Sequence, residues 1–510
     1  MKSIEAFSIL QPAKVRAGSP IRLGLLLATL SVVVGLVLEW LPTWLVSWDG
    51  VRIVGVGAVL LTAMCLSGWS TAQTDPNRAS LKSLLIIWTF LLISEQIFSR
   101  GGGDAESAFK GRFSVAAYGE ASLWILAFMI LLLLSLKTPP FFRYMFSGQY
   151  KWLSIFGLLC LLSAVYSPRQ LFSVVWAFKL CLVISVLGIC SRLIRVESDI
   201  LVFVRATFWA CSFLVFAPIW NAFADPSTGF EGARLGASPT SLSVIAGLVL
   251  VLSFTLRFSA TTAWRVIFGI VTVIASTVMI LAAGKAGIVG GLLSMVLLFL
   301  IKKKIGSAVV VLSGMIGLGV VLFFLSTPLQ SYFDMYAESG QVDSLTGRTG
   351  LWVAALPAIG QSPILGHGYM ASKFVSLQLE GVEWDASHLH NAFLEVLYNN
   401  GLIGLLLLLF MHSMVIKNLI FVIRYPGATR GLYEIAVGFL ALYANILMNS
   451  IFNAIIGGRP SDLFLIFLAI FMLSESLRKQ LSAEECLPRG TKQNRMAVYT
   501  PGQRNSVTQT

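Results

Sequence analysis

Residues 344–404 read SLTGRTGLWVAALPAIGQSPILGHGYMASKFVSLQLEGVEWDASHLHNAFLEVLYNNGLIG. This is the one long segment without the composition of a membrane helix, because apolar runs of about 20 residues fill most of the sequence on both sides of it. It contains three of the four histidines of the chain, His367, His388 and His390. We therefore expect the bilayer to hold the rest of the chain, and any chemistry to take place in this segment.

The composition predicts an all-α polytopic membrane protein. The chain has 510 residues, of which 56% are hydrophobic and 12% are charged, whereas soluble domains are about 25% charged. Backbone polar groups within lipid must satisfy one another, which favours helices. We expect about 12–14 transmembrane helices. The candidate spans are residues 21–45, 51–68, 81–97, 117–136, 151–167, 170–194, 199–222, 238–256, 264–282, 284–301, 305–326, 401–423, 431–455 and 461–477.

These spans divide the chain into regions. We expect a cytoplasmic N-terminus at 1–20, transmembrane helices at 21–326, a loop with short helices at 327–400, and further transmembrane helices at 401–477. Residues 478–510 are polar and basic, which is typical of a disordered cytoplasmic tail. The first apolar run is too long for a signal peptide and is predicted to be an uncleaved span.

Membrane topology explains the net charge of +13. Lys and Arg residues lie mainly at the ends of the apolar runs, so a nucleic-acid partner is not expected. With the N-terminus in the cytoplasm, the inside segments carry more than twice as many Lys and Arg residues as the outside segments. This orientation puts the 327–400 loop on the outer side. The six cysteines lack the spacing of a metal site or a disulfide framework.

Several cations and a histidine pair are predicted at the outer face. They are Arg234 after the span at 199–222, Lys285 at an outer turn, Arg348 at the start of the large loop, and His388 and His390 at its end. Such cations can hold a diphosphate, Arg bidentately and Lys as a point charge. A histidine can take a proton from a hydroxyl group. The set suits the transfer of a sugar from a lipid diphosphate to a hydroxyl, in which the leaving diphosphate needs charge stabilisation.

Several of these residues also have a structural interpretation. Arg234 alone is typical of a side chain that extends to the membrane interface. Arg348 stands at the start of an amphipathic helix predicted at 349–360 and can pair with a loop acid. His367 lies between two glycines, as turn residues do. His412 lies within a span, where packing is the simpler role.

Polar residues inside the spans leave other roles open. Lys179 and Arg205 are intramembrane charges and therefore functional candidates, although Arg205 is close enough to a span end to reach the interface. Lys179 has no obvious partner in the sequence. Asn445, Asn449 and Asn453 repeat every four residues, and either line a polar groove or bond helix to helix.

The residues after His390 predict a short helix at the interface. Asn391 and Glu395 are four residues apart, which puts them on one polar face of such a helix. The next apolar span then begins at Gly401.

The same segment resembles the O-antigen ligase and polymerase family. HLHNAFLE at 388–395, continuing to NGLIG at 400–404, is similar to the family's H-N-x-x-L-(E/Q) and G-L-(I/L)-G pattern. TGRTGLW at 346–352 is similar to the G-R-x-x-x-W opening of its large periplasmic loop, and RLG at 234–236 resembles its R-L-x-G motif. GKAG at 284–287 stands where the family has Ser-Arg-Ser/Thr-Ala, so this chain carries Lys in place of Arg. The resemblance covers residues 230–450.

The resemblance implies a glycosyltransferase of the bacterial inner membrane, with cytoplasmic termini and a periplasmic large loop. Such proteins transfer a glycan from undecaprenyl diphosphate to an acceptor hydroxyl, without a nucleotide sugar, a metal or another cofactor. A chain-length regulator is a candidate partner. Matched by position, Arg234 and Lys285 would hold the donor diphosphate, and Arg348 would position the loop or the donor.

The resemblance also assigns roles to the residues before the span at 401–423. His390, or alternatively His388, would activate the acceptor hydroxyl. Asn391 and Glu395 would support the histidines.

The sequence leaves three alternative functions open. A polymerase of O-antigen or exopolysaccharide repeat units is favoured, because the span plan with a long tail is less usual for a ligase. A ligase would pass finished polymer to the lipid A core. A transporter of lipid-linked sugars would use intramembrane charges and alternating access between related halves. Lys179 and Arg205 favour the transporter, whereas the missing internal repeat and the large loop with histidines on one face favour the enzyme.

Overall fold

The computed structural model describes residues 145–224, 230–231, 234–235, 239–325, 348–377 and 388–485, together with positions 81, 84–93, 124, 127–128, 327 and 330–331. The chain divides into two compact units, residues 1–55 and 56–510, and all described residues belong to the second. The predicted spans at 21–45 and 51–68, and parts of those at 81–97 and 117–136, lie outside the described residues.

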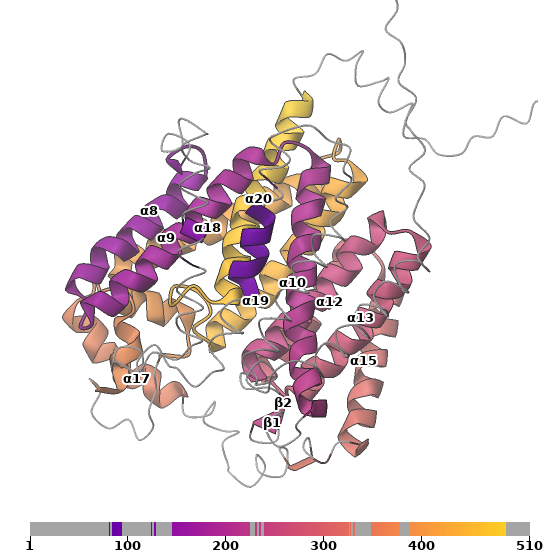
Figure 1. The fold of residues 1–510 in the computed structure, drawn as a ribbon, viewed down its shortest axis with the longest axis horizontal. Helices are drawn as coiled ribbons and strands as arrows, with labels where there is room; N and C mark the ends of the chain where they lie inside the picture. Colours follow the sequence, from indigo (N-terminus) through magenta and orange to yellow (C-terminus); the bar gives the residue numbers. More distant parts are fainter. Residues whose placement is uncertain are drawn as a thin grey trace, which may run out of the picture. The chain divides into compact units, whose positions relative to one another are not determined.

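The described chain is almost entirely helical (Figure 1). The helices before the loop are α8 (Tyr150–Ser163), η1 (Ala164–Tyr166), α9 (Gln170–Leu193), α10 (Glu197–Ala224), α12 (Pro239–Leu256), η2 (Arg257–Ser259), α13 (Thr262–Leu281), α14 (Lys285–Ile301) and α15 (Ile305–Leu325). The loop contains α17 (Arg348–Gln361) and the 3-10 helix η4 (Ala371–Leu377), and it is followed by α18 (Ala392–Arg424), α19 (Arg430–Phe452) and α20 (Asp462–Glu485). The short strands β1 (Phe230–Glu231) and β2 (Arg234–Leu235) pair antiparallel, with Phe230 opposite Leu235 and Glu231 opposite Arg234.

Seven described helices are long and apolar enough to cross a membrane, namely α9, α10, α12, α13, α15, α18 and α19. Shorter apolar helices occur at Leu84–Ile93, Tyr150–Tyr166 and Lys285–Ile301. The protein is therefore an all-α, multi-pass membrane protein, which confirms the fold class predicted from the sequence. Apart from α18 and α20, the helices from α8 onwards that were predicted as spans begin and end within about one helical turn of their predicted bounds.

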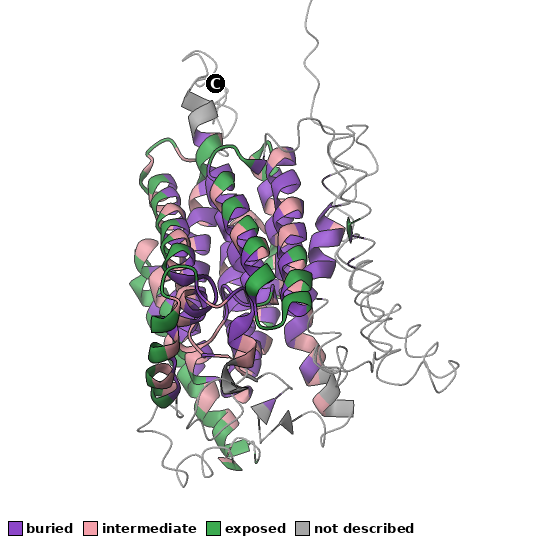
Figure 2. Ribbon diagram, turned by 90° about the vertical axis from the view of Figure 1, so that its left-hand side faces the viewer, coloured by how far each residue is buried: buried purple, intermediate pink, exposed green. Residues whose placement is uncertain are grey.

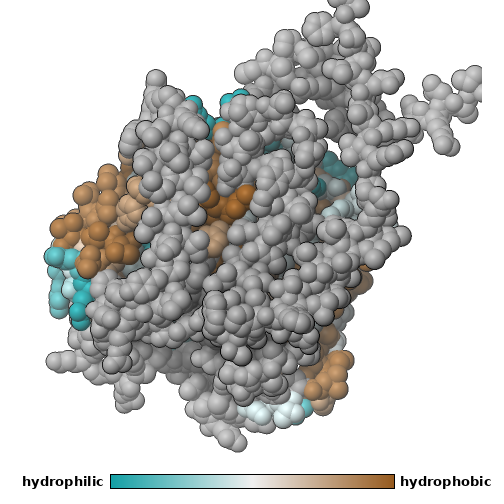
Figure 3. Space-filling model, viewed as in Figure 1, coloured by the Kyte–Doolittle hydropathy of each residue, from teal (hydrophilic) through white to brown (hydrophobic). Residues whose placement is uncertain are grey.

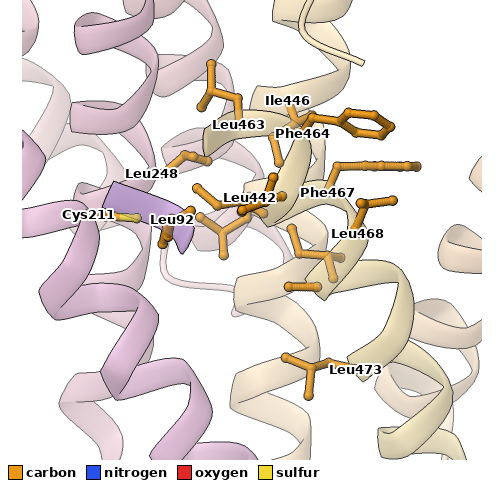
Figure 4. Packing of buried hydrophobic residues seen from close by; sticks show 14 of the residues in the cluster. Leu92, Cys211, Leu248, Leu442, Ile446, Leu463, Phe464, Phe467, Leu468 and Leu473 are labelled. Carbon is orange, nitrogen blue, oxygen red and sulfur yellow. The ribbon is translucent and has the colours of Figure 1, made fainter. Parts of the chain in front are cut away.

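α20 is surrounded by other helices. Every residue from Leu463 to Leu473 is at most 3% exposed, and a helix that is apolar on all sides is expected to be buried. Figure 4 shows Phe464 and Phe467 of α20 in the same apolar cluster as Leu442 and Ile446 of α19. The predicted last span is thus a central helix of the bundle.

α15 has the opposite character. Its described buried residues are Ala308 and Met315 alone, and Val310, Phe324 and Leu325 are each more than 70% exposed. Figure 3 shows hydrophobic surface over α15 at the lower right, and Figure 2 shows exposed residues on the outward faces of the described helices. A long, exposed, apolar helix is suited to contact with lipid.

Contacts between α14 and α19 define two ends of the bundle. Gly290 of α14 lies against Asn445 and Asn449 of α19, whereas Lys302, just beyond the other end of α14, forms a 2.5 Å ion pair with Glu434. The two helices are therefore antiparallel. We call the end at which α12, α14, α18 and α20 begin the loop end, and the opposite end the tail end. α17, β1 and β2 lie at the loop end, in the lower part of Figure 1.

The asparagine repeat of α19 bonds helix to helix. Asn445 and Asn449 are fully buried. The side chain of Asn445 donates to the carbonyl of Val244 in α12 (3.4 Å), and Asn449 donates to the side chain of Asn445 (2.8 Å). The structure thus favours packing over a polar groove at these two positions. His412 also packs inside the bundle, where its imidazole is hydrogen-bonded to the hydroxyl of Tyr443.

Both intramembrane charges have close neighbours. The ammonium group of Lys179 lies 4.3 Å from the ring centre of Trp176 and 5.0 Å from that of Trp124, and such cation–π contacts stabilise a cation away from water. The guanidinium of Arg205 donates to the hydroxyl of Ser259 (3.3 Å) near the tail end. Structural contacts therefore account for the two residues that favoured a transporter.

α18 is divided by a kink at Gly401. Its first part, from Ala392, is the short helix predicted after His390, and its second part follows Gly401, where the apolar span was predicted to begin. Gly401 has non-helical φ and ψ, and the N–H groups of Leu402 and Ile403 donate to the carbonyls of Pro363 and Ile364 (2.8 and 3.4 Å), so the two parts are separate helices.

α20 ends later than predicted. It continues to Glu485, past residue 477, after which a disordered tail was expected. Arg478 donates to the side chain of Asn418 in α18 (3.2 Å), and Lys479 forms a 2.9 Å ion pair with Glu475. These contacts hold the additional turns of α20. Residues 486–510 lie outside the described residues.

Candidate active site

The loop forms a small apolar core of its own at the loop end. α17 coincides with the amphipathic helix predicted at 349–360, and one face of it contributes residues four apart to this core. The indole N–H of Trp352 on α17 donates to the backbone carbonyl of Leu389 (2.8 Å). α17 therefore fixes the backbone just before α18. The core residues are Leu351, Ala355, Ile359, Ala371, Leu389 and Tyr398.

His367 has the structural role that its sequence context predicted. It belongs to the turn at 362–370, which lies on the kink of α18. Its Nε2 atom lies 2.8 Å from the carbonyl oxygen of Ala358, and its ring stacks on that of Tyr398 with the ring centres 4.5 Å apart. A ring nitrogen and the ring face of His367 therefore both make structural contacts.

His388 and His390 lie side by side before the first turn of α18. Leu389 between them is fully buried in the apolar core of the loop. Their ring centres are 4.0 Å apart. His390 has a φ of 50°, a backbone conformation uncommon for residues other than glycine and one found at functional sites.

Both histidines are held in the neutral form. Burial lowers the pKa of His390 to about 4, with the charges of Arg348 and Lys373 acting in the same direction. Burial also lowers the pKa of His388 to about 2. The charges that add to this second effect are those of Lys373, His390, Arg459 and Arg348. Because the ordinary value is about 6.5, both imidazoles are uncharged at neutral pH, and His390 is the stronger base.

Three cations approach the histidine pair from separate segments. Arg348 is the first residue of α17, Lys373 lies in η4, and Arg459 lies in the segment 453–461 between α19 and α20. Only Arg348 was a predicted site residue. Sequence reasoning missed Lys373 and Arg459, although both belong to the few cations of the predicted outer segments, which is the signal that singles them out.

Asn391 and Glu395 differ from their predicted positions on a polar helix face. Asn391 precedes α18 as its cap, and its side chain accepts the backbone N–H groups of Phe393 and Leu394 (3.0 Å each). Glu395 is only 1% exposed. The segment 453–461 covers it so closely that a Cβ atom at Gly458 would lie 2.8 Å from its Oε1. Asn391 therefore caps α18, whereas Glu395 is buried beneath the segment 453–461.

Arg234 and Lys285 lie at the loop end on other elements. Arg234 lies in β2, just before α12, and Lys285 is the exposed first residue of α14. Ser243 of α12 lies against Gly287 of α14, and its hydroxyl donates to the carbonyl of Gly284 (3.2 Å). The starts of α12 and α14 are therefore adjacent. Both cations share an end of the bundle with the histidine pair, and their approach to His390 itself stays a prediction.

The fold and this site define a multi-pass membrane protein with a neutral histidine pair among cations at one end of its helices. Residues 270–409 match the family model described as O-antigen ligase. This part of the chain is therefore similar to the O-antigen ligase family, the family that its motifs resemble. The matched region includes Lys285, Arg348, Lys373 and both histidines of the pair, whereas Arg459 lies beyond it.

A curated relative is similar over a short stretch. The chain is 36% identical over 77 residues to the exopolysaccharide production protein ExoQ of Rhizobium meliloti (strain 1021). The stretch covers 14% of this chain and 18% of the relative. The chain thus aligns with less than a fifth of the length of that protein.

Proposed function

We propose that this protein transfers a glycan from undecaprenyl diphosphate to a sugar hydroxyl at the loop end, and that it joins repeat units of an O-antigen or exopolysaccharide. One observation carries the proposal. Two neutral imidazoles lie in contact beside three cations, in a region that matches the O-antigen ligase family model. A proton acceptor next to positive charge is what attack by a hydroxyl on a sugar diphosphate requires.

In the proposed reaction the acceptor oxygen forms a bond to the anomeric carbon of the donor sugar. The bond between that carbon and the diphosphate oxygen breaks, and its electron pair leaves with the lipid diphosphate. The hydroxyl proton passes to His390, which is neutral and the stronger base of the pair. Arg348, with Arg234 and Lys285, stabilises the negative charge of the leaving diphosphate, so the proposed reaction needs no metal ion.

Donor binding adjusts the basicity of His390. The charges of Arg348 and Lys373 help to lower its pKa in the free protein. A bound diphosphate offsets these charges, so the pKa of His390 rises toward neutrality when the donor is present. The proton acceptor therefore becomes stronger when the substrate is in place.

The pH dependence of the transfer reaction follows from this coupling. His390 is active when deprotonated, so activity is lost as the pH falls through its pKa. We expect kcat/KM, which reports the free protein, to stay constant down to about pH 5 and to fall near pH 4, because the pKa is lowered to about 4. The acid limb of kcat, which reports the donor complex, should lie at a higher pH. Half-loss of kcat/KM near pH 6.5 would contradict this assignment.

The distribution of charge supports a periplasmic loop end. Apart from Lys179, Arg205 and Lys417, which lie within the helices, the described cations at the tail end outnumber those at the loop end, as expected for a cytoplasmic tail end. At the tail end they are Lys151, Arg192, Arg195, Arg257, Arg265, Lys302, Lys303, Lys304, Arg424, Arg430, Arg478 and Lys479. At the loop end they are Arg169, Arg234, Lys285, Arg348, Lys373 and Arg459. We accordingly propose the bacterial inner membrane as the location, with both termini in the cytoplasm.

The role of Lys285 can be tested by two substitutions. Lys285→Arg restores the residue that the family carries and should retain activity. Lys285→Ala removes a charge-assisted contact with the diphosphate and should lower kcat/KM by about tenfold or more. Transfer is measured with both variants at matched protein levels. Equal activity of the two variants would show that Lys285 does not bind the diphosphate.

Polymerisation is favoured over ligation by the similarity to a protein of exopolysaccharide production. A deletion strain complemented with the gene decides between them, with surface glycan and lipopolysaccharide compared on one gel. Single repeat units on the lipid A core, or loss of exopolysaccharide with intact lipopolysaccharide, in the deletion strain would support a polymerase. Long polymer on the carrier lipid with bare core would support a ligase. Carrier-linked units that remain on the cytoplasmic side would support a transporter and contradict the proposal.

A further inference from the structure

Arg459 is an exposed cation between buried residues. In the segment 453–461, Ile455 and Ile456 are at most 5% exposed, and Pro460 is also buried. The hydroxyl of Tyr369 donates to the carbonyl of Gly458 (2.6 Å), and the N–H of Ser461 donates to the carbonyl of Arg459 (2.7 Å). The backbone on both sides of Arg459 is therefore fixed while its side chain is accessible.

Glycines bring this segment down onto the first turns of α18. Gly457 has a φ of 84°, and a Cβ atom at this position would lie 1.9 Å from a methyl carbon of Val396. Gly458 lies against Glu395, where the corresponding distance is 2.8 Å. Only residues without a side chain permit this approach. This close packing places Arg459 beside the start of α18. The positive charge of Arg459 acts on His388 and on Glu395.

Lys373 reaches the same place from η4. The N–H of the preceding Ser372 donates to the side chain of Asn399 in α18 (2.8 Å), which donates back to the hydroxyl of Ser372 (3.0 Å). The following Phe374 packs edge-on against Phe172 of α9, with the ring centres 5.5 Å apart. Lys373 is therefore also held between two anchored neighbours. Its charge acts on the same carboxyl and on both histidines of the pair.

We propose that Arg459 and Lys373 form an anion site beside His388 that takes the diphosphate of the lipid carrier. This inference deepens the proposed function and rests on it for the identity of the carrier. An arginine binds two phosphate oxygens in a fixed fork, whereas a lysine acts as a point charge.

The test measures anion binding independently of glycan transfer. The full chain is placed in lipid nanodiscs, and its affinity for inorganic pyrophosphate and for undecaprenyl diphosphate is measured by calorimetry. Arg459→Gln and Lys373→Gln should each weaken binding of both probes by about 10-fold to 100-fold, since each removes a charge-assisted contact. Arg459→Lys should give an intermediate affinity. If only the lipid probe is weakened, the site recognises more than the diphosphate, and the proposal in this form is wrong.

Two substitutions at the tail end serve as matched controls. Arg265 and Lys304 are exposed there, and Arg265→Gln and Lys304→Gln remove the same charges without expected effect on binding. Unchanged affinity in both Arg459→Gln and Lys373→Gln would overturn the proposal. Should a variant not fold, the unmodified protein is labelled with phenylglyoxal, and pyrophosphate should protect Arg459; labelling of Arg459 at an unchanged rate would also overturn it.

The proposed function and the proposed anion site can fail independently of each other. Loss of pyrophosphate binding in the variants, with no glycan transfer by the unmodified protein, would leave the anion site standing and remove the proposed function. Glycan transfer by the unmodified protein, together with unaltered pyrophosphate binding in the variants, would support the proposed function and overturn the anion site.

Discussion

Replacing His390 by alanine is expected to lower glycan transfer by about 100-fold or more, since a positioned general base contributes about 10²–10⁴-fold to such a step. His390 follows the buried Leu389 and precedes the cap of α18, so its side chain is not part of the apolar core of the loop. The variant should therefore insert normally. Polymer in a complemented deletion strain is measured by gel, and membrane levels of the protein by immunoblot.

His388→Ala is the matched control for this result. The two rings are in contact and have similar surroundings, but the pKa of His388 is lowered further, to about 2, so it is the weaker base. We expect a smaller loss of transfer than in His390→Ala. Polymer of near-normal length in the His390→Ala strain would show that His390 is not the general base. A larger loss of transfer in His388→Ala than in His390→Ala would assign the general base to His388.

Replacing Gly401 by alanine is expected to destabilise the protein by about 3–5 kcal/mol, because strained backbone and steric overlap act together. Gly401 has a φ of 64°, and a Cβ atom there would lie 2.1 Å from the carbonyl oxygen of Ile364. The N–H of Leu402 also donates to the carbonyl of Pro363 (2.8 Å) at this kink. An added side chain would separate the turn at 362–370 from α18 and so disturb the position of the histidines.

Thermal unfolding in detergent measures this effect, with an expected fall in the apparent Tm of about 5 °C or more. Gly314→Ala on α15 is the control, because a Cβ atom at Gly314 meets nothing within 4 Å and alanine has the higher helix propensity. That variant should be as stable as the unmodified protein or slightly more stable. An apparent Tm of Gly401→Ala equal to that of the control would show that the kink is not required.

Hydropathy alone predicted most of the helices, because an apolar run of membrane-spanning length has few other folded forms in lipid. It could not predict that α20 is central and α15 peripheral. α15 and the stretch of α20 at 463–473 are both strongly apolar, and burial depends on which helices surround them. The end of α20 was also missed, since its last turns are held by contacts such as that between Arg478 and Asn418, which are 60 residues apart in sequence.

The candidate site was predictable in part for a similar reason. The motifs predicted the histidine pair and Arg348 as site residues, because these residues all belong to one loop of the sequence. Arg459 comes from the segment after α19, and only the folded bundle brings it to His388. Glu395 was predicted on a polar face by its spacing from Asn391. The spacing of Asn391 and Glu395 gives no information about Gly457 and Gly458, whose segment covers Glu395 in the folded protein.

The most direct measurement uses purified protein in liposomes that contain undecaprenyl-diphosphate-linked glycan. Released undecaprenyl diphosphate and elongated glycan are followed together, with EDTA present. We expect the unmodified protein to form both products in equal amounts, and His390→Ala to form neither at a measurable rate. Equal rates for the two proteins, or no coupled release by correctly inserted unmodified protein, would contradict glycan transfer at the histidine pair.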